Sequence, residues 1–231
     1  MSFPYKDRTR PSIGNHEYGP PLGCGADSCP TYRGVGGYFD YFGSSAGPRP
    51  TRSPQSGPSA HGYYSWNIGA WHVVVLNSMC YAVGGCGAGS PQERWLRQDL
   101  AANQDKKCVL AYWHHPRFSS GQSGGYTHFR AFWQALHEYR AEIVLVGHDH
   151  VYERFAPQSS TGSASSTGPR EFMVGTGGKN LGRFVTTRPN SQRRIRAHGV
   201  LRLRLHPTTY DWRFARITDG ASLDSGTASC V

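Results

Sequence analysis

Residues 143–150 are Ile-Val-Leu-Val-Gly-His-Asp-His, an apolar run that ends in two histidines. A short, β-branched run that stops at a glycine is typical of a strand buried on both faces. Two histidines that flank one residue at the end of such a strand are suited to two adjacent metal positions. The remaining ligands must then come from residues that the fold brings to the same strand end.

The segment just upstream predicts a second strand and a helix. Residues 108–113 are Cys-Val-Leu-Ala-Tyr-Trp, and His114, His115 and Pro116 follow, where the proline bars simple continuation of a strand. Helical spacing of apolar residues then appears at Phe129, Phe132, Trp133 and Leu136. A strand, a helix and a strand in this order predict two parallel strands with a right-handed crossover. We therefore expect His114 and His148 at one sheet edge, where open α/β sheets place their ligands.

A third polar corner lies near the start of the sequence. Gly14, Asn15, His16 and Glu17 follow a short run at residues 11–13 that we predict to be extended. Such strand-to-loop corners often hold functional residues. Asn15 offers a carbonyl oxygen to a metal, and His16 offers an imidazole to a metal or a substrate, although a turn with a capping asparagine explains the same residues. Three histidine-bearing corners favour a metal site over three unrelated structural histidines.

The remaining patterned segments complete a mixed α/β domain. Residues 71–77 predict a strand covered on both faces, and residues 171–175 predict a strand that enters a glycine turn. Residues 201–205 and 210–214 alternate apolar with charged side chains, which predicts an antiparallel hairpin with its arginines toward solvent. We predict a single domain over residues 1–231 with an antiparallel second sheet.

One helix start is unusually clear. Ser90 can cap the helix, Pro91 suits its first turn, and Glu93 completes a capping box. Trp95, Leu96 and Leu100 are expected to form the buried stripe of this helix.

Residues 19–65 are rich in glycine, proline and serine, and we predict a long loop region there. Residues 38–42, Tyr-Phe-Asp-Tyr-Phe, form an aromatic cluster inside it. A long irregular stretch in a compact domain is often functional. The cluster suits either a lid over a cleft or an anchor that pins the loop to the core.

The composition suits a loop-rich globular protein, with a formal net charge of +10. Many arginines lie between Arg183 and Arg216, which predicts a basic surface that attracts phosphate-bearing molecules or is simply solvated. No nucleic-acid-binding motif accompanies this charge, so nucleic acid is not indicated as a partner. No apolar stretch has the length of a membrane span, and residues 1–8 lack the apolar core of a signal peptide.

The six cysteines do not have the spacing of a zinc ribbon. Cys24 and Cys29 are close together, as are Cys80 and Cys86, whereas Cys108 and Cys230 are left over. Local disulfides fit this spacing and predict a secreted or otherwise extracytoplasmic protein, while free buried thiols are the alternative.

The motifs at residues 14–17, 114–116 and 147–154 together resemble those of the calcineurin-like metallophosphoesterases. The Tyr-Glu-Arg at residues 152–154 is most similar to the purple acid phosphatase branch, and order and spacing agree across roughly residues 11 to 180. The resemblance implies a four-layer α/β/β/α sandwich, here N-terminally shortened. It also implies hydrolysis of phosphate monoesters or diesters by a metal-activated hydroxide.

The resemblance further implies roles for individual residues. Asn15, His114 and His148 would bind one metal ion, and His150 would bind a second. His16 and Asn15 would be catalytic, with His16 contacting the phosphate and assisting the leaving group. The mixed nitrogen and oxygen ligands suit Zn, Fe or Mn. The implied substrate-binding residues are His16, His115, Tyr152 and Arg154.

The sequence also departs from the family pattern. The family has two further motifs ahead of Gly-Asn-His, which supply the bridging carboxylate and most ligands of the second metal. Only fourteen residues precede Asn15, and Asp7 is the one acidic residue among them. Three hypotheses follow: a truncated enzyme, a shortened variant with one metal, or a degenerate, non-catalytic module that binds anions.

Overall fold

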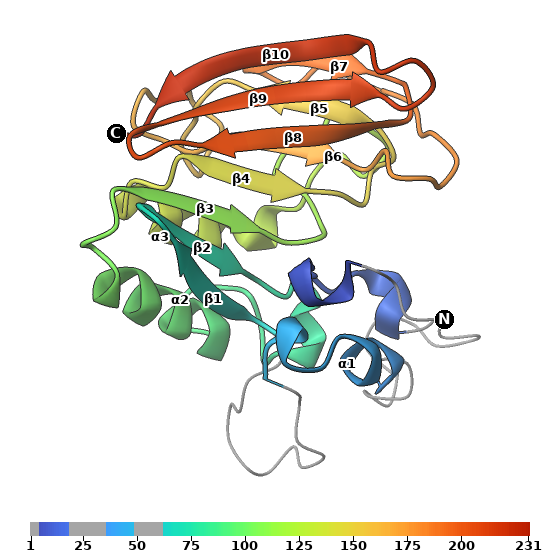
Figure 1. Ribbon diagram of the computed structural model, residues 1–231. Coiled ribbons are helices and arrows are strands. Elements are labelled where there is room, and N and C mark those ends of the chain that lie inside the picture. The colour runs from blue at the N-terminus through green and yellow to red at the C-terminus, as the bar shows by residue number, and fades with distance from the viewer. Residues whose placement is uncertain (1–4, 19–35, 49–61) are drawn as a thin grey trace.

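The computed structural model describes residues 5–18, 36–48 and 62–231, whose strands form two sheets (Figure 1). The larger sheet has seven strands in the order β1-β2-β3-β4-β6-β5-β7. These are β1 (Tyr64–Ile68), β2 (Trp71–Val75), β3 (Cys108–Tyr112), β4 (Ile143–Val146), β5 (Tyr152–Phe155), β6 (Arg170–Val174) and β7 (Ser191–Ile195). The smaller sheet has three strands in the order β10-β9-β8, namely β8 (Gly199–Leu205), β9 (Thr209–Arg216) and β10 (Ser222–Ser229).

The parallel centre of the larger sheet positions the histidines. Strands β2, β3, β4 and β6 are parallel neighbours, whereas β1, β5 and β7 pair antiparallel. Helices α2 (Pro91–Ala102) and α3 (Arg130–Glu138) connect the parallel strands and pack on one face of the sheet. The predicted strand–helix–strand unit is confirmed, because β3 and β4 pair in parallel and α3 lies between them in the chain.

The apolar spacing that predicted α3 and the capping residues that predicted α2 both have a structural explanation. Phe129, Phe132, Trp133 and Leu136 are all fully buried against the sheet. At the start of α2, Ser90 Oγ accepts a hydrogen bond from Glu93 N at 3.4 Å. The Glu93 carboxylate accepts from Gly89 N at 2.9 Å, so the return bond of the predicted capping box falls one residue earlier.

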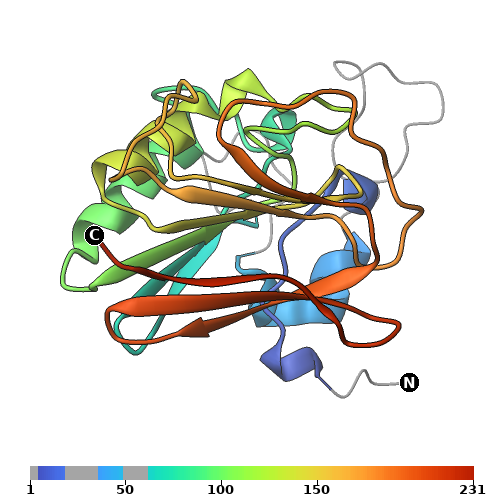
Figure 2. The same ribbon diagram turned by 90° about the horizontal axis from the view of Figure 1, so that it is seen from above.

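The smaller sheet covers the opposite face of the larger one. Figure 2 shows the resulting layers from above, with α2 and α3 on one side of the larger sheet and the smaller sheet on the other. Phe172 and Tyr152 of the larger sheet pack against Trp212 and Phe214 of β9. Arg202, Arg204 and Arg213 alternate with these apolar residues and are exposed, which confirms the predicted hairpin.

The mixed α/β fold is therefore confirmed, with two differences in detail. Strands β5, β7 and β10 carry short or polar sequences that gave no strand pattern. In the part of the chain that is described, three of the four expected layers are present, because the outer face of the smaller sheet carries exposed polar side chains and no helix.

The segment directly ahead of Asn15 does not pair as a strand. Tyrosine hydroxyls hold it instead, because Tyr38 and Tyr64 donate hydrogen bonds to the carbonyl of Pro11 at 3.0 and 2.7 Å. Tyr38 belongs to α1 (Gly36–Phe42), which is followed by a 3₁₀ turn at Gly43–Ala46. Within the described residues, the aromatic cluster thus anchors the N-terminal segment, with Tyr38 and Phe39 buried around Ile13.

Two disulfides link described cysteines. Cys80 pairs with Cys86, as the spacing predicted, and Cys108 pairs with Cys230 across 122 positions. Cys24 and Cys29 lie outside the described residues, as does most of the loop region at residues 19–65. No helix in the described parts of the chain combines the length and the apolar character that crossing a membrane requires.

Candidate metal centre

Three side chains from three separate segments converge beyond the carboxyl ends of β3 and β4. His114 follows β3, His148 follows β4, and Asn15 begins a 3₁₀ turn at Asn15–Tyr18. Nε2 of His114 lies 2.8 Å from Oδ1 of Asn15 and 3.1 Å from Nδ1 of His148. One amide oxygen and one imidazole nitrogen therefore lie within hydrogen-bonding distance of the same nitrogen of His114.

The two histidines are held in their neutral form. Burial lowers the pKa of His114 to about 4, and the neighbouring His148 lowers it further in the same direction. Burial also lowers the pKa of His148, against the opposing effect of Asp149. Neutral imidazole is the form that binds a cation, so no proton has to be displaced at neutral pH.

Close backbone approach by Gly14 helps to position His114. A Cβ atom at residue 14 would lie 2.9 Å from Nδ1 of His114, which is closer than side-chain packing allows. Gly14 N also donates a hydrogen bond to Oε2 of Glu17 at 2.7 Å, which closes the turn that carries Asn15. The Gly-Asn-His-Glu motif is therefore a compact turn built against the His114 ring.

His148 has a left-handed backbone conformation, with φ of 64°. This region is unfavourable for a residue with a Cβ atom and requires support from its surroundings. Asp149 supplies that support, because its carboxylate accepts hydrogen bonds from Ser123 N at 3.1 Å and from Ser123 Oγ at 2.6 Å. Ser119 Oγ donates to the same carboxylate. The loop at residues 119–125 thus ties down the turn that carries both histidines.

Tyr126 ends this loop and reaches the other side of the His148 ring. Its hydroxyl lies 3.2 Å from Nε2 of His148. When Nδ1 of His148 is the ligand atom, Nε2 carries the proton and donates it to this hydroxyl. Ligand histidines in proteins commonly donate their second N–H in this way, which fixes the tautomer and the ring orientation.

His115 lies beside His114 and His148. Within the described residues, His114, His115 and His148 form a group whose potential ligand atoms all lie within 4.8 Å of one another. Nδ1 of His115 lies 2.8 Å from Oγ of Ser78, and its ring packs on His148 with centroids 4.3 Å apart. Burial lowers its pKa to about 3. His115 is thus engaged with Ser78, whereas Asn15 Oδ1 directly faces Nε2 of His114.

His16 and His150 lie at the margin of this cluster. His16 is exposed on the same turn as Asn15, and its charge contributes to the lowered pKa values of His114 and His148. Nδ1 of His150 donates a hydrogen bond to the carbonyl of Asn180 at 2.9 Å, which leaves Nε2 as its potential ligand atom. His150 is not part of the group of potential ligands found among the described residues.

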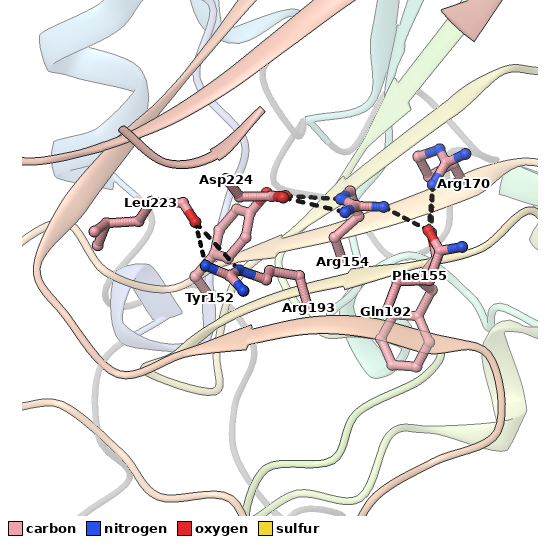
Figure 3. Close-up of polar contacts among 8 residues, drawn as sticks. All are labelled: Tyr152, Arg154, Phe155, Arg170, Gln192, Arg193, Leu223 and Asp224. Atoms are coloured by element: carbon pink, nitrogen blue, oxygen red, sulfur yellow. Dashed lines mark hydrogen bonds and ion pairs between the residues drawn. The ribbon is translucent and has the colours of Figure 1, made fainter. Parts of the chain in front are cut away.

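Tyr152 and Arg154 are not brought to the histidines. Tyr152 is fully buried on β5, and its hydroxyl donates to Oδ2 of Asp224 at 2.7 Å. Nε of Arg154 donates to the same oxygen at 2.7 Å (Figure 3). Both side chains thus join β5 to β10 between the sheets, and the substrate-binding roles expected for them stay predictions.

Sequence reasoning missed three residues that support the site, namely Ser78, Tyr126 and Asp149. Asp149 stands between the two motif histidines, and its position was a signal that its side chain is also held at the strand end. Ser78 and Tyr126 lie in segments without periodicity, and only the folded chain brings them to His115 and His148.

Comparisons with known proteins agree with this architecture. A family model described as calcineurin-like phosphoesterase matches residues 2–152. Purple acid phosphatase 15 of Arabidopsis thaliana is 33% identical over 136 residues, which cover 54% of this chain and 23% of the relative. Purple acid phosphatase 21 of the same plant is 30% identical over 171 residues, which cover 69% of this chain and 38% of the relative.

A solved structure supports the fold. The purple acid phosphatase PPD1 from yellow lupin (Lupinus luteus) seeds matches with a TM-score of 0.71 at 20% identity, over 94% of this chain and 40% of that chain. The chain therefore spans well under half the length of each of these proteins. Because the family model covers more than half of the sequence, the chain belongs to the calcineurin-like phosphoesterase family.

Proposed function

We propose that this chain hydrolyses phosphate esters with the help of a transition-metal ion held by Asn15, His114 and His148. The observation that carries this proposal is the convergence of their ligand atoms, with Nε2 of His114 2.8 Å from Asn15 Oδ1 and 3.1 Å from His148 Nδ1. Family membership supports phosphoester hydrolysis as the general activity.

The donor set fits a cation of this kind. Ligands at about 2.0–2.1 Å from a tetrahedral zinc ion lie about 3.3 Å from one another, and the two spacings around His114 are close to that value. Three protein ligands with one open position are the usual arrangement of a catalytic zinc site. Nitrogen and carbonyl-type oxygen donors also suit iron or manganese.

The chemistry that such a cation supplies when bound is activation of water at neutral pH and neutralisation of charge on the phosphoryl oxygens. The protein residues then bind and orient the ester. His16 is exposed beside Asn15, where its protonated form can donate to a phosphoryl oxygen or to the departing alcohol. The formal net charge of +10 favours the approach of an anionic ester.

A second cation would need ligands beyond His150. The hydrogen bond from Nδ1 of His150 to Asn180 O orients the ring as in many metal sites. Among the described residues, however, no group of three or more potential ligands includes His150. We therefore propose one metal ion per chain for the described site.

We also propose that the protein works in an oxidising, extracytoplasmic compartment. The pairs Cys80–Cys86 and Cys108–Cys230 support this, because disulfides persist there and are rare in the cytosol.

Turnover of an aryl phosphate monoester and an aryl phosphate diester by the zinc- or manganese-loaded chain tests the enzymatic proposal. We expect His114→Ala and His148→Ala to lower the rate by at least about a hundredfold. His206→Ala removes an exposed histidine that pairs with Asp211 and serves as the matched control. Equal rates in all four proteins would refute the proposal, and salt-sensitive phosphate binding without turnover in all of them would support an anion-binding module.

A further inference from the structure

The smaller sheet presents an edge at β8 that is open beyond Gly199, whose N–H and carbonyl bond to Thr176. In the described parts of the chain, β8 pairs with β9 and with no strand on its other side (Figure 1). At the two ends of this ladder, His206 N donates to Thr209 O and Ile217 N donates to His198 O. Because antiparallel pairs alternate between bonded and non-bonded partners, the peptide groups of Leu201 and Leu203 point toward the open edge.

An apolar cavity lies beside this edge. It has a volume of about 440 Å³ and lies between β8 and the carboxyl ends of β3, β4 and β6. Leu201 and Leu203 line it from the smaller sheet, Leu145 and Val174 line it from the larger one, and His114 borders it at the candidate metal centre. A strand added to β8 would therefore find both free peptide groups and an apolar space for alternate side chains.

The outer face of the same sheet is positively charged and therefore favours an added strand with acidic side chains. Arg202, Arg204 and Arg213 are exposed there, with Asp211 as the acidic residue among them, around a hollow of about 280 Å³. Side chains of an added strand alternate between the two faces, so its second set would lie beside these arginines. A second copy of β8 would instead place Arg202 and Arg204 next to their own equivalents, which is unfavourable.

We propose that β8 binds an extended peptide segment of a partner protein, in which apolar residues alternate with acidic ones, as an additional strand. The apolar side chains fill the cavity between the sheets, and the acidic side chains pair with Arg202 and Arg204. The backbone of the segment hydrogen-bonds with Leu201 and Leu203.

The test uses the full chain and a fluorescently labelled peptide of alternating valine and glutamate. The peptide has the same length as β8, which is seven residues. A peptide of alternating valine and lysine is the control. Fluorescence anisotropy should show the glutamate peptide binding at least about tenfold more tightly. The double variant Arg202→Glu, Arg204→Glu, which alters only exposed side chains, should reverse this preference.

Hydrogen exchange of the backbone amides distinguishes strand addition from simple charge attraction. Bound glutamate peptide should protect the amides of Leu201 and Leu203, whereas a charge contact alone would not. The proposal is overturned by equal affinity for the two peptides or by binding without this protection. It is also overturned if the chain alone protects these amides through concentration-dependent dimerisation, because the occupant is then a second copy.

Discussion

The hydroxyl of Tyr126 lies 3.2 Å from Nε2 of His148, while the other nitrogen of that ring, Nδ1, faces His114. In the proposed metal site, a hydroxyl in this position fixes the tautomer of His148. The loop that carries Tyr126 is in turn held by the carboxylate of Asp149, the neighbour of His148. His148, the hydroxyl of Tyr126 and the carboxylate of Asp149 are thus connected through one loop.

Replacing Tyr126 with phenylalanine tests the role of the orienting hydroxyl. Tyr126→Phe keeps the ring and removes the hydrogen bond to His148, so we expect zinc affinity to fall by about tenfold or more. Competition with a chromogenic chelator measures the affinity. Tyr139→Phe is the matched control. Tyr139 is a partly buried tyrosine that packs against the core between the larger sheet and helices α2 and α3. Equal zinc affinity in wild type and Tyr126→Phe would contradict the orienting role.

Removing the Asp149 carboxylate should cost stability. In Asp149→Ala, the buried Ser119 hydroxyl and the amide and hydroxyl of Ser123 lose their acceptor, so we expect a loss of about 2–3 kcal/mol. Ser123→Ala removes one of these bonds and should cost about 1 kcal/mol. Urea unfolding at neutral pH gives both values. A cost for Asp149→Ala no larger than that of Ser123→Ala would show that the carboxylate does not anchor the loop.

The two disulfides should contribute unequally to stability. Cys108 and Cys230 close a loop of 122 positions, whereas Cys80 and Cys86 close one of 6. Loop-closure entropy predicts a cost of about 4–5 kcal/mol for replacing the first pair with serine and about 2 kcal/mol for the second. Thermal unfolding of the two double variants ranks them. The reverse order would exclude loop length as the dominant effect.

Glu142 should make folding stability depend on pH. Burial raises the pKa of this carboxyl to about 7, although the amides of Val109 and Val231 donate to it and act in the opposite direction. The folded protein then binds a proton that the unfolded chain releases above about pH 4.3, so stability should fall as pH rises from about 4.3 to 7.

The contribution of Glu142 to this fall should be about 3 kcal/mol. Urea unfolding of wild type and Glu142→Gln at several pH values isolates it, because the variant lacks the titrating group. A wild type that gains stability over this range relative to Glu142→Gln would show that the backbone donors outweigh burial.

Apolar patterns, either periodic or as a continuous run, predicted the parts of the fold that pack into the core. The helix with Phe132 and Trp133, the strand at residues 143–146 and the hairpin with Leu203 all bury a regular apolar set. Strand β7 did not stand out, because its sequence Ser-Gln-Arg-Arg-Ile is polar and it pairs through its backbone at a sheet edge. Such edge strands are specified by their neighbours and not by their own sequence.

The sequence predicted the site residues that directly follow parallel strands. It did not predict the loop residues that hold those side chains in place. The convergence of His114 and His148 follows from the β3–α3–β4 crossover. Tyr152 closely follows the motif histidines in the chain, yet its hydroxyl bonds to Asp224, because adjacency to a motif does not reveal which sheet face a residue occupies. Tyr126 reaches His148 only because the buried Asp149 folds the intervening loop, and sequence spacing does not encode that bond.

The number of metal ions bound per chain tests the central claim most directly. Elemental analysis should be carried out on the purified full chain after zinc loading and removal of loosely bound metal. We predict one zinc ion per wild-type chain and none in His114→Ala or His148→Ala, with one retained in the control His206→Ala. A wild-type chain without zinc, or a His114→Ala variant that retains the wild-type amount, would contradict the assignment of Asn15, His114 and His148 as a metal site.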